Sequence, residues 1–300
     1  MLELKFPKRI GLEEKSFEYL VNLNRKVEKV KKSEIRMDFS CTTIFVISHL
    51  AMMMYIVEGI VKRKNKLVSV FKNFEVEGED VVRELYKYYG DSHGNVVNPC
   101  KLKFLYDNNE EQPWLDKLRH LELEKYDKIK VVISELVANL KMHTLYKEGT
   151  MAGHVDVKNQ YLILSIANYD ITIKNNLKRK QRMIFYNDYE AVLWALKRSN
   201  TTRDEEESGG LGLYLLRKYI HELGAECIII SGNCFLKLDR TCFDKKKENI
   251  IHVKKYNIMS CSYEGNIITL SFPLIKSNKK DRECIKRQEI SLGEMYGMYN

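Results

Sequence analysis

Three short apolar runs in the second half of the chain limit the folds that it can adopt. They are Tyr161–Ala167 (YLILSIA), Cys227–Ser231 (CIIIS) and Ile267–Phe272 (IITLSF). Runs of this length, rich in β-branched residues, are typical of buried β-strands. A helical pattern over residues 116–146 precedes them, and helices are also predicted over Tyr189–Lys197 and Leu213–Leu223. This half is therefore expected to combine helices with a sheet.

The first half contains a strand–helix–strand pattern. Glu34–Phe39 alternates charged and apolar residues, Ile44–Lys62 is long and apolar, and Lys66–Phe71 is a short apolar run. This order predicts an α/β domain with some parallel strand pairing. The polar segment Asn108–Pro113 ends in proline, so we expect a domain boundary there. The predicted domains are 1–113 and 114–276, followed by a charged tail or helix over 277–300.

Composition narrows the class of protein. The 300 residues are 44% hydrophobic and carry a formal net charge of +9, which suits a globular chain with an anionic ligand, a nucleic acid or a solvated surface. The most apolar run, residues 44–60, contains His49 and Glu58, so no membrane span is expected. Seven cysteines without a CxxC pair, and no apolar leader, indicate reduced thiols in the cytoplasm. A zinc site from Cys234, Cys242 and Cys261 is a weak alternative.

Two motifs contain residues that could bind a ligand or take part in catalysis. Glu135 and Asn139 lie four residues apart in a helical pattern, so they share one helix face. An amide oxygen can ligate Mg²⁺, and a carboxylate can activate a water or a hydroxyl. The segment Ser208–Leu213 (SGGLGL) is rich in glycine and opens a helix, where backbone N–H groups attract phosphates. Taken alone, a solvated helix face and an ordinary entry turn explain these two motifs as well.

The order of these motifs resembles the ATP-binding domain of the GHKL superfamily, which includes gyrase, histidine kinases and mismatch-repair ATPases. The resemblance covers about residues 116–276. It implies a two-layer α/β sandwich of the GHKL (Bergerat) type with a mixed sheet, so the whole chain is expected to be α+β. The N-terminal half resembles a STAS-like α/β domain. Within that half, Ser40 is either a phosphorylation site or an ordinary serine at a strand end.

The resemblance implies a role for each motif residue. It implies that Asn139 ligates Mg²⁺, that Glu135 is the catalytic base and that Asn168 recognises adenine. The remaining residues implied in binding ATP are His143, Asp170, Thr202, Arg203, Gly209, Gly210, Leu211, Gly212 and Leu213. His143 is equally well explained as a packing residue, and Arg203 as a solvated surface residue.

Two departures from the family pattern concern the base pocket. The family has an Asp followed by two glycines in a DxGxG pattern, whereas this chain has Asn168, with Asp170 and Thr172 in place of the glycines. The glycine-threonine box near the end of the family's domain is reduced here to Gly265-Asn266. An Asn oxygen still accepts a hydrogen bond from adenine, but more weakly than a carboxylate does.

The leading hypothesis is therefore an ATP- and Mg²⁺-binding regulatory protein that acts as a nucleotide-dependent switch on a protein partner, with ATP hydrolysis or serine-kinase activity left open. The alternative is a degenerate, non-catalytic GHKL domain that serves as a protein–protein interaction module. The basic segment Lys237–Lys255 leaves a third reading, nucleic-acid binding, which is less expected because few aromatic residues accompany the charges. Glu205, Glu206 and Glu207 are fallback candidates for the base.

Overall fold

The computed structural model describes residues 1–90, 96–103, 112–119, 126–145, 148–156, 160–198 and 212–274. These residues form two compact units. The first consists of Met1–Pro99 with Ala152–Gln160, and the second of Cys100–Met151 with Tyr161–Leu274. The division runs through two strands, β7 (Val96–Lys103) and β8 (Glu148–Asp156). The predicted boundary at residue 113 stays a prediction.

The first unit is an α/β structure built around a four-stranded sheet of order β1-β3-β5-β6. β3 pairs in parallel with β1 and with β5, and β6 is antiparallel to β5. The parallel pairing that the sequence predicts for this half is therefore confirmed. Its elements are β1 (Leu2–Lys5), β2 (Arg9–Ile10), α1 (Glu14–Glu28), β3 (Glu34–Asp38), β4 (Ile44–Phe45), the 3₁₀ helix η1 (Ile47–His49), α2 (Leu50–Lys62), β5 (Lys66–Val70), β6 (Glu75–Glu77), η2 (Gly78–Asp80) and α3 (Val81–Gly90).

The helix predicted over Ile44–Lys62 is wrong in its first three residues, because helical structure begins with the 3₁₀ helix η1 at Ile47. Ile44 and Phe45 form β4, which pairs in parallel with β2, and α2 begins only at Leu50. Ile44, Phe45 and Val46 are β-branched or aromatic, and such residues favour extended backbone. Hydrogen bonds from Thr43 N and Ile44 N to the Lys8 carbonyl hold this segment beside β2.

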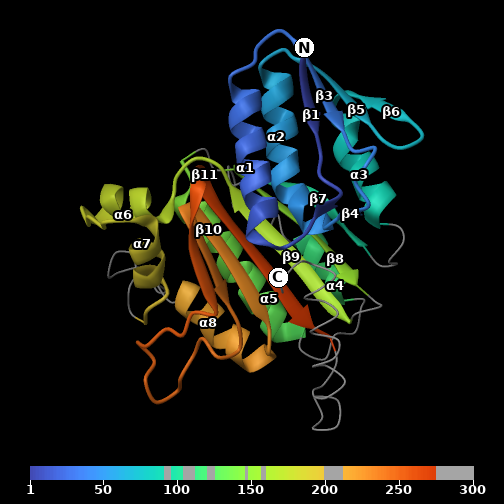
Figure 1. The fold of residues 1–300 in the computed structure, drawn as a ribbon. Helices are drawn as coiled ribbons and strands as arrows, with labels where there is room; N and C mark the ends of the chain where they lie inside the picture. The colour runs from blue at the N-terminus through green and yellow to red at the C-terminus, as the bar shows by residue number, and fades with distance from the viewer. Residues whose placement is uncertain are drawn as a thin grey trace. The chain divides into compact units, whose positions relative to one another are not determined.

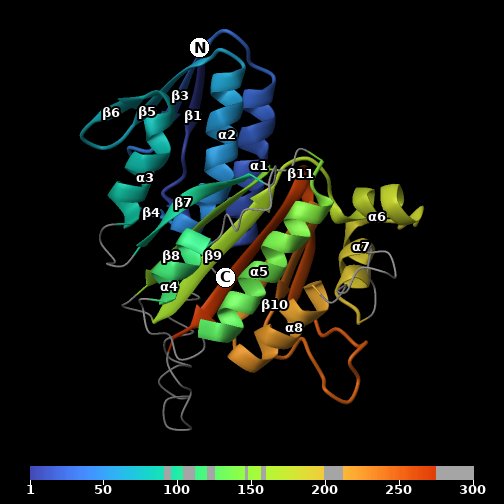
Figure 2. The same ribbon diagram turned by 180° about the vertical axis from the view of Figure 1, so that it is seen from behind.

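A five-stranded sheet of order β10-β11-β9-β8-β7 lies mainly in the second unit, and the division between the units runs through its strands β8 and β7. In this sheet β11 is antiparallel to both β10 and β9. The combination of helices and sheets confirms the predicted α+β class. Figures 1 and 2 show α5 and α8 side by side along this sheet, and Figure 2 has both in front of it. The remaining elements are α4 (Gln112–Arg119), α5 (Tyr126–His143), β9 (Tyr161–Asn168), α6 (Ile173–Gln181), α7 (Asp188–Ala195), α8 (Gly212–Leu223), β10 (Glu226–Leu238) and β11 (Lys255–Pro273).

β10 bends back on itself at Gly232. Glu226 begins the strand, yet its carboxylate forms an ion pair with Lys237, eleven residues later, at 2.9 Å. Eleven residues of straight strand would span about 36 Å, so the strand must reverse between them. Gly232 has φ +61° and lies at the two register shifts of the β10–β11 pairing. The strands predicted over 227–231 and 267–272 are correct, but both extend into this reversal.

Several other elements differ from the expectation. The helix predicted over 116–146 includes the end of α4 and all of α5, and residues 120–125 between them lie outside the described part. The predictions of helices near residues 189–197 and 213–223 are confirmed by α7 and α8. The polar stretch after β9 contains a helix, α6, that was not predicted. It begins because Thr172 caps it, accepting a hydrogen bond from Asn175 N at 3.1 Å.

Gly265 gives a first test of this fold. A Cβ atom there would lie 2.1 Å from the Asn168 carbonyl oxygen, so we expect Gly265→Ala to lower the free energy of unfolding by about 3 kcal/mol or more. Gly224→Ala is the matched control. It has φ +65° and no atom closer than 4.0 Å, so backbone strain alone should lower the free energy by about 1 kcal/mol. Urea denaturation of both variants measures the difference, and equal losses would contradict the close packing.

Candidate functional site

Helix α5 carries the predicted metal and catalytic residues. Ile129, Val132, Ile133, Leu136 and Val137 are buried. Glu135 and Asn139 are partly exposed and lie one turn apart. The apolar residues pack the helix onto the unit, so the face with Glu135 and Asn139 is left for other contacts. His143 is the last residue of the same helix and is also partly exposed.

The side chain of Asn139 is unusual. It forms no hydrogen bond with any residue that the structure describes, although its Nδ2 atom is buried. Leaving a buried amide hydrogen unpaired costs about 1–3 kcal/mol. Such a group is expected where a ligand or another segment supplies the partner. The Oδ1 atom likewise has no protein donor in the described part of the chain, so it can accept a cation.

The start of α8 lies along the same part of α5. Lys128, near the start of α5, forms an ion pair at 2.8 Å with Glu222, near the end of α8. Figure 2 shows the two helices running alongside each other. Gly212 lies ten residues before Glu222, about 15 Å along the axis, so antiparallel helices bring it level with residue 138 of α5. We therefore expect the start of α8 to lie near the turn that carries Glu135 and Asn139.

Arg217 anchors α8, a role that the sequence analysis missed. It is fully buried, and its guanidinium donates hydrogen bonds to the backbone carbonyls of Glu248 and Ile250. It also lies 5.3 Å from the ring centre of Phe243. Burial lowers the pKa of Arg217. A pair of charged residues, Arg217 and Lys218, inside the otherwise apolar run YLLRKYI was the available signal. The contact fixes α8 to the loop between β10 and β11.

Asn168 is the centre of a buried amide network. It is 4% exposed, and its Oδ1 accepts hydrogen bonds from both N and Nδ2 of Asn266, at 3.1 and 3.0 Å. Its Nδ2 donates to Asp170 Oδ1 at 2.6 Å. Asn266 Oδ1 in turn accepts from Ile173 N at 3.2 Å. An amide oxygen has two lone pairs, so both acceptor positions of Asn168 are already used within the protein.

Asp170 connects this network to α5. Its second carboxylate oxygen accepts a hydrogen bond from Leu145 N, just beyond the end of the helix. The predicted residues Asn168 and Asp170 therefore lie together, and they are linked to the segment that follows His143. Leu213 lies in the first turn of α8. The predicted residues Thr202, Arg203, Gly209, Gly210 and Leu211, and the fallback residues Glu205, Glu206 and Glu207, lie outside the described part of the chain.

A protein-only metal centre is not found among the described residues, because no three His, Cys, Asp or Glu side chains gather there. The five cysteines described in detail, Cys41, Cys227, Cys234, Cys242 and Cys261, are free thiols, and burial raises the pKa of Cys234 and of Cys242 to about 12. A high pKa keeps a thiol protonated, and the thiolate is the form that binds metals. The zinc alternative is therefore not supported.

Comparisons with known proteins do not assign the chain to a family. No protein-family model matches the chain, and no curated protein matches it. None of the helices in the described residues is long and apolar enough to cross a bilayer.

The amide network predicts the effect of Asn168→Asp. The substitution removes the donor to Asp170 and brings two carboxylates within hydrogen-bonding distance. We expect a loss of about 1–3 kcal/mol in unfolding free energy at neutral pH. Repulsion raises the folded-state pKa of one carboxyl, so the variant is most stable at low pH and loses stability as pH rises through that pKa.

Denaturation of the parent, of Asn168→Asp and of Asn175→Asp at pH 5 and pH 8 measures this effect. Asn175 is exposed on α6 and serves as the control. The same series titrated with ATP separates the two roles of Asn168. Tighter ATP binding by a fully stable Asn168→Asp would mean that the residue contacts the base instead of Asn266.

Proposed function

We propose that the second unit binds a nucleoside triphosphate with Mg²⁺, ATP being the expected nucleotide. The observation that supports this most is Asn139, whose side chain lacks a partner in the described residues and lies level with the start of α8. One amide oxygen is a poor metal site by itself. It suits Mg²⁺ that is held mainly by phosphates and water, as this ion commonly is.

The phosphate end of such a ligand fits the arrangement well. Helix α8 begins at Gly212, and a helix N-terminus attracts phosphates through its free N–H groups and its dipole. Asn139 would hold the ion that the phosphates carry. Glu135, one turn before it, is the group that would take a proton from an attacking water or hydroxyl. The nucleotide-bound metal would lower the charge repulsion against that nucleophile.

The base end fits less well. Asn168 uses both acceptor positions on Asn266, so it offers none to the adenine amino group. We therefore infer weak discrimination between ATP and GTP. The same observation favours the second candidate function, a degenerate domain that acts as a protein interaction module without turnover.

Calorimetry with Mg-ATP, Mg-GTP and ATP in EDTA tests the proposal on the full chain. We expect Asn139→Ala to weaken Mg-ATP binding at least about tenfold, because it removes the ion's protein ligand, and to leave binding in EDTA unchanged. The matched control is Asn175→Ala, an exposed asparagine on α6. Parent-like affinity in Asn139→Ala would remove this residue from the site, and absence of nucleotide binding by the parent would reject the proposal.

Glu135→Gln tests whether the unit is an enzyme. The variant keeps the size and hydrogen-bonding groups of the side chain but removes its basicity. If the parent hydrolyses ATP, we expect the variant to bind Mg-ATP normally and to turn over about 10²- to 10⁴-fold more slowly. Steady-state phosphate release measures this. Equal turnover would exclude Glu135 as the base, and a parent without turnover would favour the interaction module.

A further inference from the structure

Exposed apolar side chains gather around α7 in the second unit. Ile184 and Tyr186 are 86% and 89% exposed, more than any other large hydrophobic residue that the structure describes. Tyr256 stacks on Tyr189 of α7 with ring centres 4.5 Å apart, so the exposed part of β11 lies against the same helix. We define the α7 face by its five exposed apolar residues, Ile184, Tyr186, Ile250, Tyr256 and Ile258.

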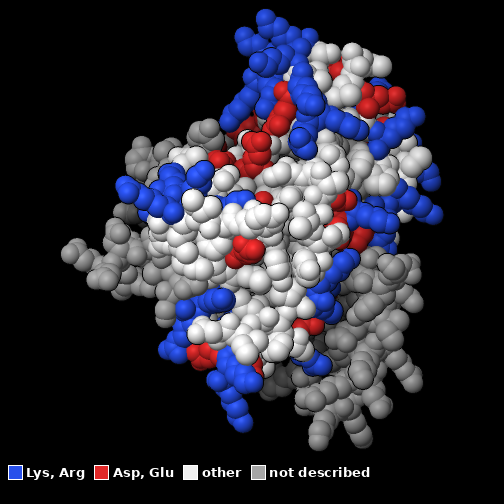
Figure 3. Space-filling view, turned by 60° about the vertical axis from the view of Figure 1, so that its left-hand side comes forward, with Lys and Arg blue, Asp and Glu red and all other residues white. Residues whose placement is uncertain are grey.

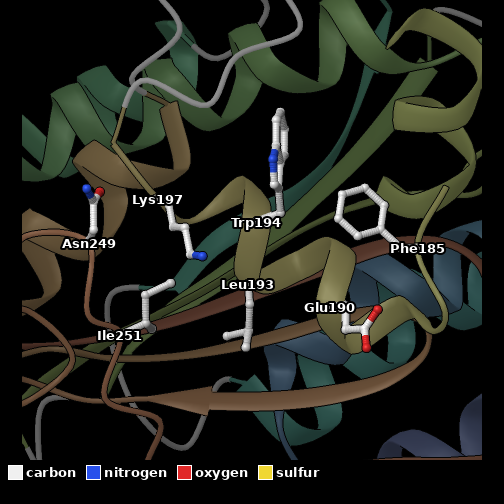
Figure 4. A pocket seen from close by; sticks show the side chains of 7 residues that line it. All are labelled: Phe185, Glu190, Leu193, Trp194, Lys197, Asn249 and Ile251. Carbon is white, nitrogen blue, oxygen red and sulfur yellow. The ribbon is translucent and has the colours of Figure 1, made fainter. Parts of the chain in front are cut away.

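A recess of about 370 Å³ lies beside α7. Figure 4 shows that Leu193, Trp194 and Lys197 contribute from the α7 region, Phe185 from the segment before it, and Ile251 from the loop between β10 and β11. Glu190 and Asn249 complete the lining. The rings of Phe185 and Trp194 have centres 6.1 Å apart. Ile184, Tyr186 and Ile250 are direct sequence neighbours of lining residues, so these three exposed apolar residues lie close to the recess.

The recess lining carries one charge of each sign, Glu190 and Lys197, but the segment that leads to it is basic. Residues 171–187 contain five basic side chains and no acidic one. Lys178 and Arg182 are exposed and form no ion pair with any described carboxylate, and the same is true of Lys197 at the recess. Figure 3 shows a broad, mostly uncharged surface with an acidic group near its middle and Lys and Arg side chains at its border. A partner that covers this surface gains by carrying negative charge.

We propose that the α7 face docks an acidic, amphipathic segment of a protein partner, with an apolar anchor side chain in the recess and carboxylates beside Lys178, Arg182 and Lys197. Apolar anchors in a pocket with a charged rim are the usual anatomy of such interfaces. The inference is independent of the proposed nucleotide site.

Other occupants fit the face less well. A nucleic acid binds exposed rings by stacking, but Ile184, Ile250 and Ile258 have no ring to offer. An anionic bilayer would attract the lysines and arginines, but a flat lipid surface does not fill a recess. A small ligand of the size of the recess would leave Tyr256 and Ile258 uncovered. Each of these occupants becomes an outcome of the test.

The test is a peptide selection on the full chain. A displayed library of random 16-residue peptides is selected against the parent and counter-selected against the double variant Ile184→Ser with Tyr186→Ser. These side chains are almost fully exposed, so we expect the variant to fold normally. The enriched peptides are then measured by fluorescence of Trp194, with Trp114 replaced by Phe so that one tryptophan reports.

We expect enriched peptides to carry net negative charge and aromatic or leucine residues at helical spacing. Their Kd should rise about tenfold or more in the double serine variant and in Lys178→Glu with Arg182→Glu. Val131→Ser removes an exposed apolar side chain from α5, and Lys245→Glu with Lys246→Glu changes charge on the β10–β11 loop. Both controls should leave the Kd unchanged.

Three outcomes would overturn the proposal. They are enrichment of basic or purely polar peptides, equal binding of the selected peptides to the serine variant, and no enrichment at all. Vesicles with and without 30% anionic lipid, and single-stranded DNA, are assayed with the same variants. Binding of either one that the serine variant abolishes, in the absence of peptide binding, would assign the face to that partner instead.

Discussion

The contact between Asn168 and Asn266 is the link on which the second unit depends. The two residues are 98 positions apart. Asn266 donates to Asn168 and to the Ile171 carbonyl, and Asn168 donates to the Asp170 carboxylate. Because buried polar groups are costly when unpaired, these bonds fix the end of β9 against β11. Ile173 N, the first residue of α6, joins the same network, and Asp170 extends it to the backbone beyond α5. Gly265 is required beside it because no side chain fits against the Asn168 carbonyl.

Because of this network, the two ends of the proposed nucleotide site differ in what they offer a ligand. At the α5–α8 end the chain offers a partly exposed carboxylate, an amide without a described partner and a helix start. At the β9 end the side chain expected to read the base is buried and fully used. Asp170, which stands where the resemblance predicted a glycine, is part of this network, whereas Thr172, at the second such position, caps α6.

Local patterns in the sequence predicted much of the fold and little of this network. Apolar runs predicted β9, α7 and α8, and the spacing of Glu135 and Asn139 placed both on one helix face. The predicted helix start was too early, because a short apolar run with β-branched residues, like the one near residue 44, is compatible with a strand and with a buried helix. The reversal of β10 depends on Glu226 meeting Lys237 and Lys254. Burial alone would raise the pKa of Glu226, but the two lysines lower it, and such pairings are not encoded in neighbouring residues.

Helix α6 connects the amide network to the α7 face. Its first residue donates to Asn266 in the amide network, whereas Lys178 lies near its other end and Arg182 just beyond it. Lys174, in its first turn, donates to the Tyr186 carbonyl at 3.1 Å and so holds the exposed apolar segment to the helix. A ligand that shifted the network would therefore act on the α7 face through this helix. Linkage then requires reciprocity, because any factor by which nucleotide changes partner affinity is the factor by which the partner changes nucleotide affinity.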